Sequence, residues 1–183
     1  MNMRTRLVAV AAVMAGGVLA TGGVAAAQEP PPPWAQPCYG LAPTIYAVPG
    51  VPTVGTNLPD VILGTPFPDQ IAGLAGNDVI CALAGNDTVY SGPGDDLVFA
   101  QEGNDFVDAG IGNDTVYGGY GDDDVIAGDG EDSVFGGPGD DRMAGGDGVD
   151  TLDGGPHVLG DTANGGAPLV GDSCPNDEFI SNC

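Results

Sequence analysis

Aspartate recurs every nine residues through the middle of this 183-residue chain, and this period constrains the fold more than any other feature. The eleven aspartates of the series are Asp60, Asp69, Asp78, Asp87, Asp96, Asp105, Asp114, Asp123, Asp132, Asp141 and Asp150. Two positions after them come Ile62, Ile71, Ile80, Val89, Val98, Val107, Val116, Val125, Val134, Met143 and Leu152. Two positions before the last nine comes glycine, from Gly76 to Gly148. Three aligned columns at one short period indicate a repeat architecture.

Each unit has a glycine-rich half and a short apolar half. Glycine tolerates positive φ and close backbone approach, so we predict that the glycine-rich half is a tight turn. The other half, such as residues 114–117, is predicted to be a short strand with its central apolar residue facing inward. A strand of this length buries little apolar surface by itself. We therefore predict an all-β solenoid in which two units close one coil and stacked coils align the Ile/Val columns.

The repeats resemble the RTX, or haemolysin-type, nonapeptide Gly-Gly-x-Gly-x-Asp-x-U-x, where U is a large apolar residue. The clearest copies are residues 118–126, 136–144 and 145–153, and the resemblance is good over 73–153 and partial over 55–72. It implies a parallel β-roll at 55–153 with two repeats per coil, whose turns bind Ca²⁺. Calcium prefers six to eight oxygen ligands, and this sequence offers oxygen mostly at its turns.

The resemblance also implies the ligands, because in this family the repeat's aspartate carboxylate and carbonyls of the glycine turn share the ion. We carry the carboxylates over only to repeats with glycine two residues before the aspartate: Asp78, Asp87, Asp96, Asp105, Asp114, Asp123, Asp132, Asp141 and Asp150. The implied carbonyl ligands are at Gly94, Gly112, Gly119, Gly121, Gly128, Gly130, Gly137, Gly139, Gly146 and Gly148. Pairing these aspartates at 18-residue spacing allows up to about seven ions.

Two groups of units depart from the pattern. Leu58 and Phe67 replace the turn glycine of the first two units, so we assign no ligands there. Residues 73–75, 82–84 and 100–102 lack the glycine pair, and we expect weaker ion binding near them. The alternative is a metal-free solenoid in which Asp and Asn serve only to form turns.

The charge of the chain is strongly unbalanced, with 26 acidic residues against three basic ones and a net charge of −23. This balance excludes a nucleic-acid partner, which requires a basic surface. Removal of residues 1–27 would take away two basic residues and no acid, leaving −25. Self-repulsion of that size opposes compaction. We therefore predict Ca²⁺ as the cofactor, with binding coupled to folding.

The N-terminus has the features of a secretory signal peptide. Arg4 and Arg6 precede the apolar residues 7–20, and 25–27 are three alanines, which predicts cleavage after Ala27 and a secreted, extracellular protein. The alternative is an uncleaved anchor, because 7–27 is long enough to span a bilayer. We expect no integral membrane span after cleavage. Residues 28–54 are predicted to be a proline-rich segment and N-terminal cap, and 154–183 a C-terminal cap or tail.

Four cysteines permit three disulfide connectivities. Cys174 and Cys183 are close in sequence, so we pair them, which leaves Cys38 with Cys81; free thiols or a metal site are the alternatives. Both predicted disulfides lie at the ends of the repeat region, where a solenoid needs caps.

One outer face of the predicted roll carries Phe99, Tyr117 and Phe135. These aromatic residues either stack across strands beneath a cover from residues 42–54, or form a stripe that binds a surface or protein partner.

We predict a secreted calcium-binding β-roll that acts as a structural or interaction module outside a bacterial cell. The alternatives are a cell-surface adhesion module, or the RTX-tail remnant of an exported toxin or enzyme without its catalytic domain. We do not expect an enzyme, because residues 28–54 are too few for a catalytic domain and His157 is the single histidine.

Overall fold

The computed structural model describes residues 38–156, 162–165 and 179–181. The predicted signal peptide, the proline-rich residues 28–37, His157 and the predicted Cys174–Cys183 disulfide lie outside these ranges. The described residues contain one short 3-10 helix, η1 (Cys38–Gly40), and none of their helices is long and apolar enough to cross a membrane.

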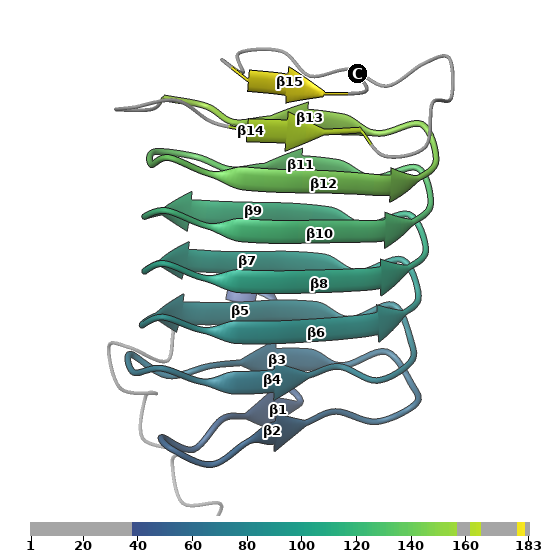
Figure 1. The fold of residues 1–183 in the computed structure, drawn as a ribbon. Coiled ribbons are helices and arrows are strands. Elements are labelled where there is room, and N and C mark those ends of the chain that lie inside the picture. The colour runs from purple at the N-terminus through teal and green to yellow at the C-terminus, as the bar shows by residue number, and fades with distance from the viewer. Residues whose placement is uncertain (1–37, 157–161, 166–178, 182–183) are drawn as a thin grey trace, which may run out of the picture. The chain divides into compact units, whose positions relative to one another are not determined.

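Two parallel sheets face each other, and the chain alternates between them (Figure 1). The first sheet contains β1 (Ile45–Tyr46), β3 (Val61–Leu63), β5 (Val79–Ala84), β7 (Leu97–Glu102), β9 (Thr115–Tyr120), β11 (Ser133–Phe135) and β13 (Thr151–Asp153). The second contains β2 (Thr53–Val54), β4 (Gln70–Ala72), β6 (Thr88–Pro93), β8 (Phe106–Ile111), β10 (Asp124–Asp129), β12 (Arg142–Asp147), β14 (Thr162–Asn164) and β15 (Phe179–Ser181). This is the predicted parallel β-roll.

Neighbouring strands within the repeats pair residues that are 18 apart in sequence. Val98 of β7, for example, pairs with Val116 of β9, and Val107 of β8 pairs with Val125 of β10. Two nonapeptides therefore form one coil, as the period predicts. The register places equivalent residues of successive repeats directly above one another, so each sequence column becomes a row of touching side chains.

The core confirms the predicted inward column. The apolar residues two positions after the aspartates form one continuous buried cluster, in which the most exposed member, Met143, is 4% exposed. The cluster extends past the predicted end of the roll, because Ala163 of β14 is also buried in it. β14 pairs with β12 at a spacing of 20 residues, since Arg142 lies opposite Thr162. This two-residue insertion is why the strict nine-residue period stops after the unit that contains Leu152.

The strands are longer than the predicted short segments. β5 to β10 and β12 each contain six residues and take in the two positions that the motif gives to its glycine pair, so the turn shrinks to three residues, such as 112–114. Strand alternation then turns a second residue inward, four positions after the aspartate. This row is buried and consists of small residues: Ala82, Ser91, Ala100, Ala109, Gly118, Ala127, Gly136, Gly145 and Gly154. A Cβ on Gly118 would lie 2.5 Å from the Asp123 Oδ2, which explains why small residues are required there.

A left-handed backbone position recurs four residues before the aspartate. Glycine occupies it in most repeats, with φ of +107° at Gly110 and +115° at Gly119. The units that lack the glycine pair place Leu74, Leu83 and Gln101 at this position, with φ between 81° and 85°. The repeat geometry therefore imposes a left-handed conformation on residues that normally avoid it.

The N-terminal residues form an additional coil. β1 pairs with β3 and β2 with β4, so residues 42–54 close the end of both sheets and do not cover the outer face as predicted. The predicted Cys38–Cys81 disulfide is present, with a Cα–Cα distance of 5.8 Å, and joins η1 to β5. Leu63 is buried against both cysteines.

The aromatic residues of the first sheet form a stacked row. The ring centroids of Phe99 and Tyr117 are 5.0 Å apart, and those of Tyr117 and Phe135 are 4.9 Å apart, with interplanar angles of 4° and 11°. Each ring therefore covers a face of the next. This agrees with cross-strand stacking, and it leaves ring edges rather than ring faces toward a partner.

Substitution of Gly119 by Ala should destabilise the chain by about 2 kcal/mol or more, because alanine disfavours the left-handed backbone and its Cβ would overlap the Gln101 carbonyl oxygen. Gln101→Ala is the matched control, since Gln101 pairs with Gly119 and already carries a Cβ at this position. Its effect should stay within about 0.5 kcal/mol. Denaturant unfolding measures both, and equal effects would contradict the steric argument.

Candidate metal centres in the turns

The repeat aspartates end the three-residue turns and point into the roll. The nine aspartates assigned from the sequence are all buried, with exposed fractions between 0% and 3%. Asp78, Asp96, Asp114, Asp132 and Asp150 follow one another along one edge of the two sheets, and the other four lie along the opposite edge. The turns of both edges are visible in Figure 1. The carboxylates that the sequence paired are therefore neighbours in successive coils.

One carboxylate oxygen of each aspartate is bonded to the backbone of the preceding coil. The N–H of Asp96 donates to Asp114 Oδ1 at 2.8 Å, and the N–H of Asp105 donates to Asp123 Oδ1 at 2.8 Å. The same bond recurs from Asp60 through Asp132, at distances between 2.7 and 3.0 Å. This inner ladder holds each carboxylate against the coil before it.

A second ladder runs in the opposite direction on the outside of the turns. The residue before the repeat aspartate accepts a bond from the following coil: Asp95 N–H donates to Asn77 Oδ1 at 3.2 Å, and Asn113 N–H donates to Asp95 Oδ1 at 3.0 Å. The outer ladder includes Asn86, Asn104, Asp122, Glu131 and Asp140. The sequence indicates turn-forming Asn and Asp residues, but it does not indicate these hydrogen bonds between coils. The signal was present, because an Asn, Asp or Glu precedes every repeat aspartate from 78 to 141.

The aspartates of the inner ladder differ from ordinary turn residues in their second carboxylate oxygen, Oδ2. Oδ2 is buried and accepts no hydrogen bond within the described part of the chain at Asp78, Asp87, Asp96, Asp105, Asp114, Asp123 and Asp132. Burying an anionic oxygen without a partner is costly, so buried carboxylates are normally paired or bind metals. Arg142, on the exposed face of β12, is the one basic residue in the described ranges. A row of bound cations would resolve this imbalance.

Main-chain carbonyl oxygens closely approach the glycines of the next coil. At all ten glycines assigned as ligands, a Cβ would overlap a carbonyl oxygen of the preceding coil: Gly112 adjoins the Gly94 oxygen and Gly128 the Gly110 oxygen. The gap between successive turns is therefore lined by carbonyls that only glycine can approach this closely. No three Asp, Glu, His or Cys side chains among the described residues converge into a ready cluster. A cation held here would need carbonyls as well as carboxylates, which is the mixed oxygen set that Ca²⁺ takes.

The environment favours the neutral acid when no metal is bound. Burial raises the pKa of Asp87, Asp114 and Asp123 to about 7. It raises the pKa of Asp96 and Asp132 to about 6. Burial also holds the pKa of Asp78 and of Asp105 above the usual range for aspartate. The backbone N–H bond of the inner ladder opposes this increase in pKa, and the charge of neighbouring aspartates adds to it at most of these positions.

The first two aspartates are arranged differently. Asp60 Oδ2 accepts hydrogen bonds from the Thr56 N–H at 2.7 Å and the Thr56 hydroxyl at 2.9 Å. Asp69 Oδ2 accepts one from the Thr65 N–H at 2.6 Å. Thr56 and Thr65 occupy the position four residues before the aspartate, which is left-handed in later repeats. Each donates to the Oδ2 atom of its aspartate, whereas Oδ2 of a later aspartate such as Asp114 accepts no hydrogen bond from the described residues. The absence of repeat ligands at the first two units stays a prediction.

The fold and these turns define a parallel β-roll built from aspartate-containing nonapeptides. The family model described as RTX calcium-binding nonapeptide repeat matches in four copies, at residues 54–89, 82–116, 99–134 and 117–152. Together the copies span more than half of the chain, which therefore belongs to the RTX calcium-binding nonapeptide repeat family. No curated protein matches the chain.

The stability of the calcium-free chain should decrease as the pH rises from 5 to 8. The raised pKa values mean that the folded state holds protons that the unfolded state, with aspartate pKa near 3.8, has already lost. This stabilisation is fully present below the unfolded pKa and disappears as the pH passes through about 6 to 7. Thermal unfolding at several pH values, without calcium, measures the change. A Tm that rises with pH over this range would contradict it.

Proposed function

We propose that this chain is a secreted calcium-binding β-roll whose Ca²⁺ ions, held between stacked turns, are coupled to its folding. The observation that carries this proposal is the row of buried Oδ2 atoms from Asp78 to Asp132, which accept no hydrogen bond from the described residues, together with glycine positions that carbonyl oxygens of the preceding coil approach closely. The aspartates from 78 to 150 would supply the carboxylates and the glycines of the same turns the carbonyls. Bound calcium would supply the positive charge that the described residues lack.

Ion number and affinity follow from the repeat arithmetic. Seven pairs of aspartates at 18-residue spacing set a maximum of about seven ions, which would change the net charge of residues 28–183 from −25 to about −11. Sites of this mixed type in extracellular modules bind with dissociation constants on the order of 10⁻⁴ to 10⁻³ M. Such sites fill outside the cell, where calcium is abundant. Metal binding that completes a site on folding adds its binding free energy to the stability of the fold.

An extracellular location is supported by the disulfide. Cys38 and Cys81 are 3% and 2% exposed, and disulfides persist mainly in oxidising compartments. The N-terminal signal-peptide pattern points to the same location. We propose a structural or interaction role there and no catalytic role, because Oδ1 of the buried carboxylates is used in the inner ladder and Oδ2 is assigned to calcium. A surface or protein partner on the Phe99, Tyr117 and Phe135 face stays a prediction.

Two neighbouring substitutions separate calcium ligation from charge. Asp123→Asn removes a proposed ligand shared by two gaps, whereas its Oδ1 still accepts the Asp105 N–H. The matched control is Asp122→Asn, which changes the same charge on the exposed outer ladder and keeps an acceptor for the Asp140 N–H. Equilibrium dialysis of the full chain at several millimolar calcium should show one or two fewer ions for Asp123→Asn and no change for Asp122→Asn.

Two results of this experiment would overturn the proposal. Wild-type protein that retains no calcium at several millimolar would remove the calcium-binding function itself. Wild-type binding with identical losses in both variants would show that general negative charge, and not the inner carboxylates, retains the ions. Far-UV circular dichroism checks that each variant retains its β structure.

A further inference from the structure

On the first sheet, the outward positions beside the core column hold no charged residue from β3 to β11, although the chain has 26 acidic residues. These positions are Val61, Leu63, Val79, Cys81, Leu97, Phe99, Thr115, Tyr117, Ser133 and Phe135. The same positions of the second sheet include two aspartates and Arg142. The stacked rings of Phe99, Tyr117 and Phe135, called here the aromatic row, run along the uncharged face, and Tyr117 is 39% exposed. An apolar surface of this kind is typical of a face that binds another segment.

The described chain begins beside the aromatic row. The disulfide joins Cys38 to Cys81 of β5, and η1 packs against β3 and β5. Phe99, the first ring of the row, packs against the buried cluster of Cys38, Leu63 and Cys81. Residues 41–44 lead from η1 to β1, so the chain after η1 runs away from the row. The residues before Cys38 therefore join this face at the Phe99 end of the row.

The sequence before Cys38 matches this face in charge and in length. Residues 31–37 (PPPWAQP) contain no charged side chain. A proline-rich segment favours the polyproline II conformation, which rises about 3.1 Å per residue, so Trp34 is about 12 Å from Cys38 in such a segment. Tyr117 and Phe135 lie two and three coils beyond the disulfide, which is about 10 and 14 Å at a strand spacing of about 4.8 Å. The segment is therefore long enough to bring Trp34 to the second half of the aromatic row.

We propose that residues 31–37 dock along the aromatic row in the polyproline II conformation, with the Trp34 ring packed against Tyr117 and Phe135. Proline-rich segments bind aromatic surfaces in this way because their conformation is already restricted, so little entropy is lost on docking. The disulfide at Cys38 makes the contact intramolecular, with an effective concentration on the order of millimolar, so a weak contact is sufficient. The docked segment occupies the face on which the sequence also predicts a partner, and it uses no calcium ligand of the turns.

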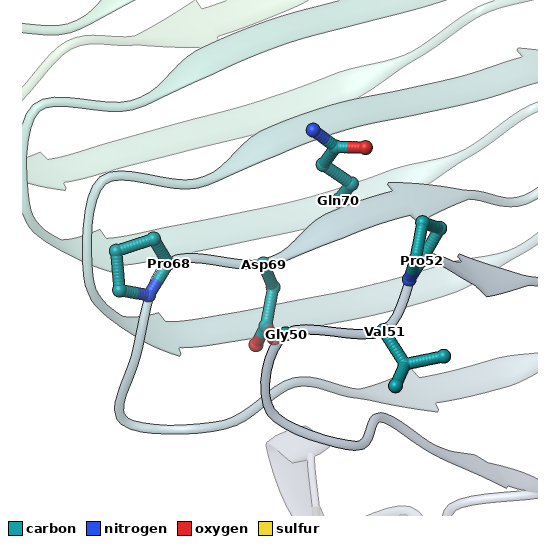
Figure 2. A pocket seen from close by; sticks show the side chains of 6 residues that line it. All are labelled: Gly50, Val51, Pro52, Pro68, Asp69 and Gln70. Carbon is teal, nitrogen blue, oxygen red and sulfur yellow. The ribbon is translucent and has the colours of Figure 1, made fainter.

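Two hollows at the second sheet fit this segment less well. The smaller, of about 170 Å³, lies beside the start of β4 and has no aromatic ring in its lining (Figure 2). It is lined by Gly50, Val51, Pro52, Pro68, Asp69 and Gln70. The larger, of about 250 Å³, includes Val54 and Tyr90. Both belong to the second sheet, whereas the disulfide holds Cys38 against β5 of the first sheet, on the other side of the roll (Figure 1).

Trp34 is the single tryptophan of the chain, so its fluorescence reports on this segment alone. Acrylamide should quench Trp34 several-fold less in the full chain, at several millimolar Ca²⁺, than in a peptide of residues 28–37. Tyr117→Ser removes the central ring of the row and should raise quenching toward the value of the peptide. The matched control is Tyr90→Ser, at the same repeat position of the second sheet and 51% exposed, which should leave quenching unchanged. Far-UV circular dichroism checks that both variants retain their β structure.

Three results would overturn the inference, and each leaves calcium binding at the turns unaffected. Wild-type quenching equal to that of the peptide, or unchanged quenching in Tyr117→Ser, would show that Trp34 does not pack on the row. Increased quenching in Tyr90→Ser alone would place the segment at the second sheet. Quenching that increases on dilution would show docking on a second copy of the chain. Nuclear Overhauser effects between the Trp34 indole and the Tyr117 ring of the wild type are expected, and they require no variant.

Discussion

The hydrogen bond from each aspartate N–H to the carboxylate of the next coil is the interaction on which this structure depends. It recurs nine times at 2.7 to 3.0 Å and sets the 18-residue register that stacks one turn over another. Because Oδ1 is used in this bond, Oδ2 is turned toward the interior of the turn. The same geometry that builds the roll therefore buries a row of anionic oxygens along each edge.

The other positions of the repeat accommodate this row of carboxylate oxygens. Small residues such as Gly118 leave room for the Oδ2 of the following turn, and turn glycines such as Gly112 let carbonyls approach between coils. The outer Asn and Asp ladder adds a bond of opposite direction, but Oδ2 of the inner aspartates such as Asp114 still accepts no hydrogen bond from the described residues. A metal-free solenoid accounts for the outer ladder and gives no role to the inner oxygens. A cation between the turns accounts for both.

The period of nine predicted the roll, its core column and the pairing of aspartates, because a strict repeat in sequence becomes a strict repeat in space. It did not predict six-residue strands, because a Gly-Gly pair is typical of turns. The sequence does not show that the first glycine of the pair, such as Gly118, is buried in a strand. The left-handed Leu74, Leu83 and Gln101 show that the geometry persists where the motif fails. Residues outside the period were predicted only as caps or a cover, without their strands: 42–54 form an added coil, and Ala163 resumes the core after a two-residue insertion.

Coupling between calcium and folding is the central claim, and unfolding of the full chain with and without the ion tests it most directly. The experiment is a far-UV circular dichroism measurement near pH 8, where the buried aspartates have lost their protons, in chelator and then in millimolar Ca²⁺ or Mg²⁺. Calcium should convert a largely unfolded chain to a cooperatively folded β structure, and magnesium should not. A chain that is equally folded and equally stable in chelator and in calcium would contradict the claim.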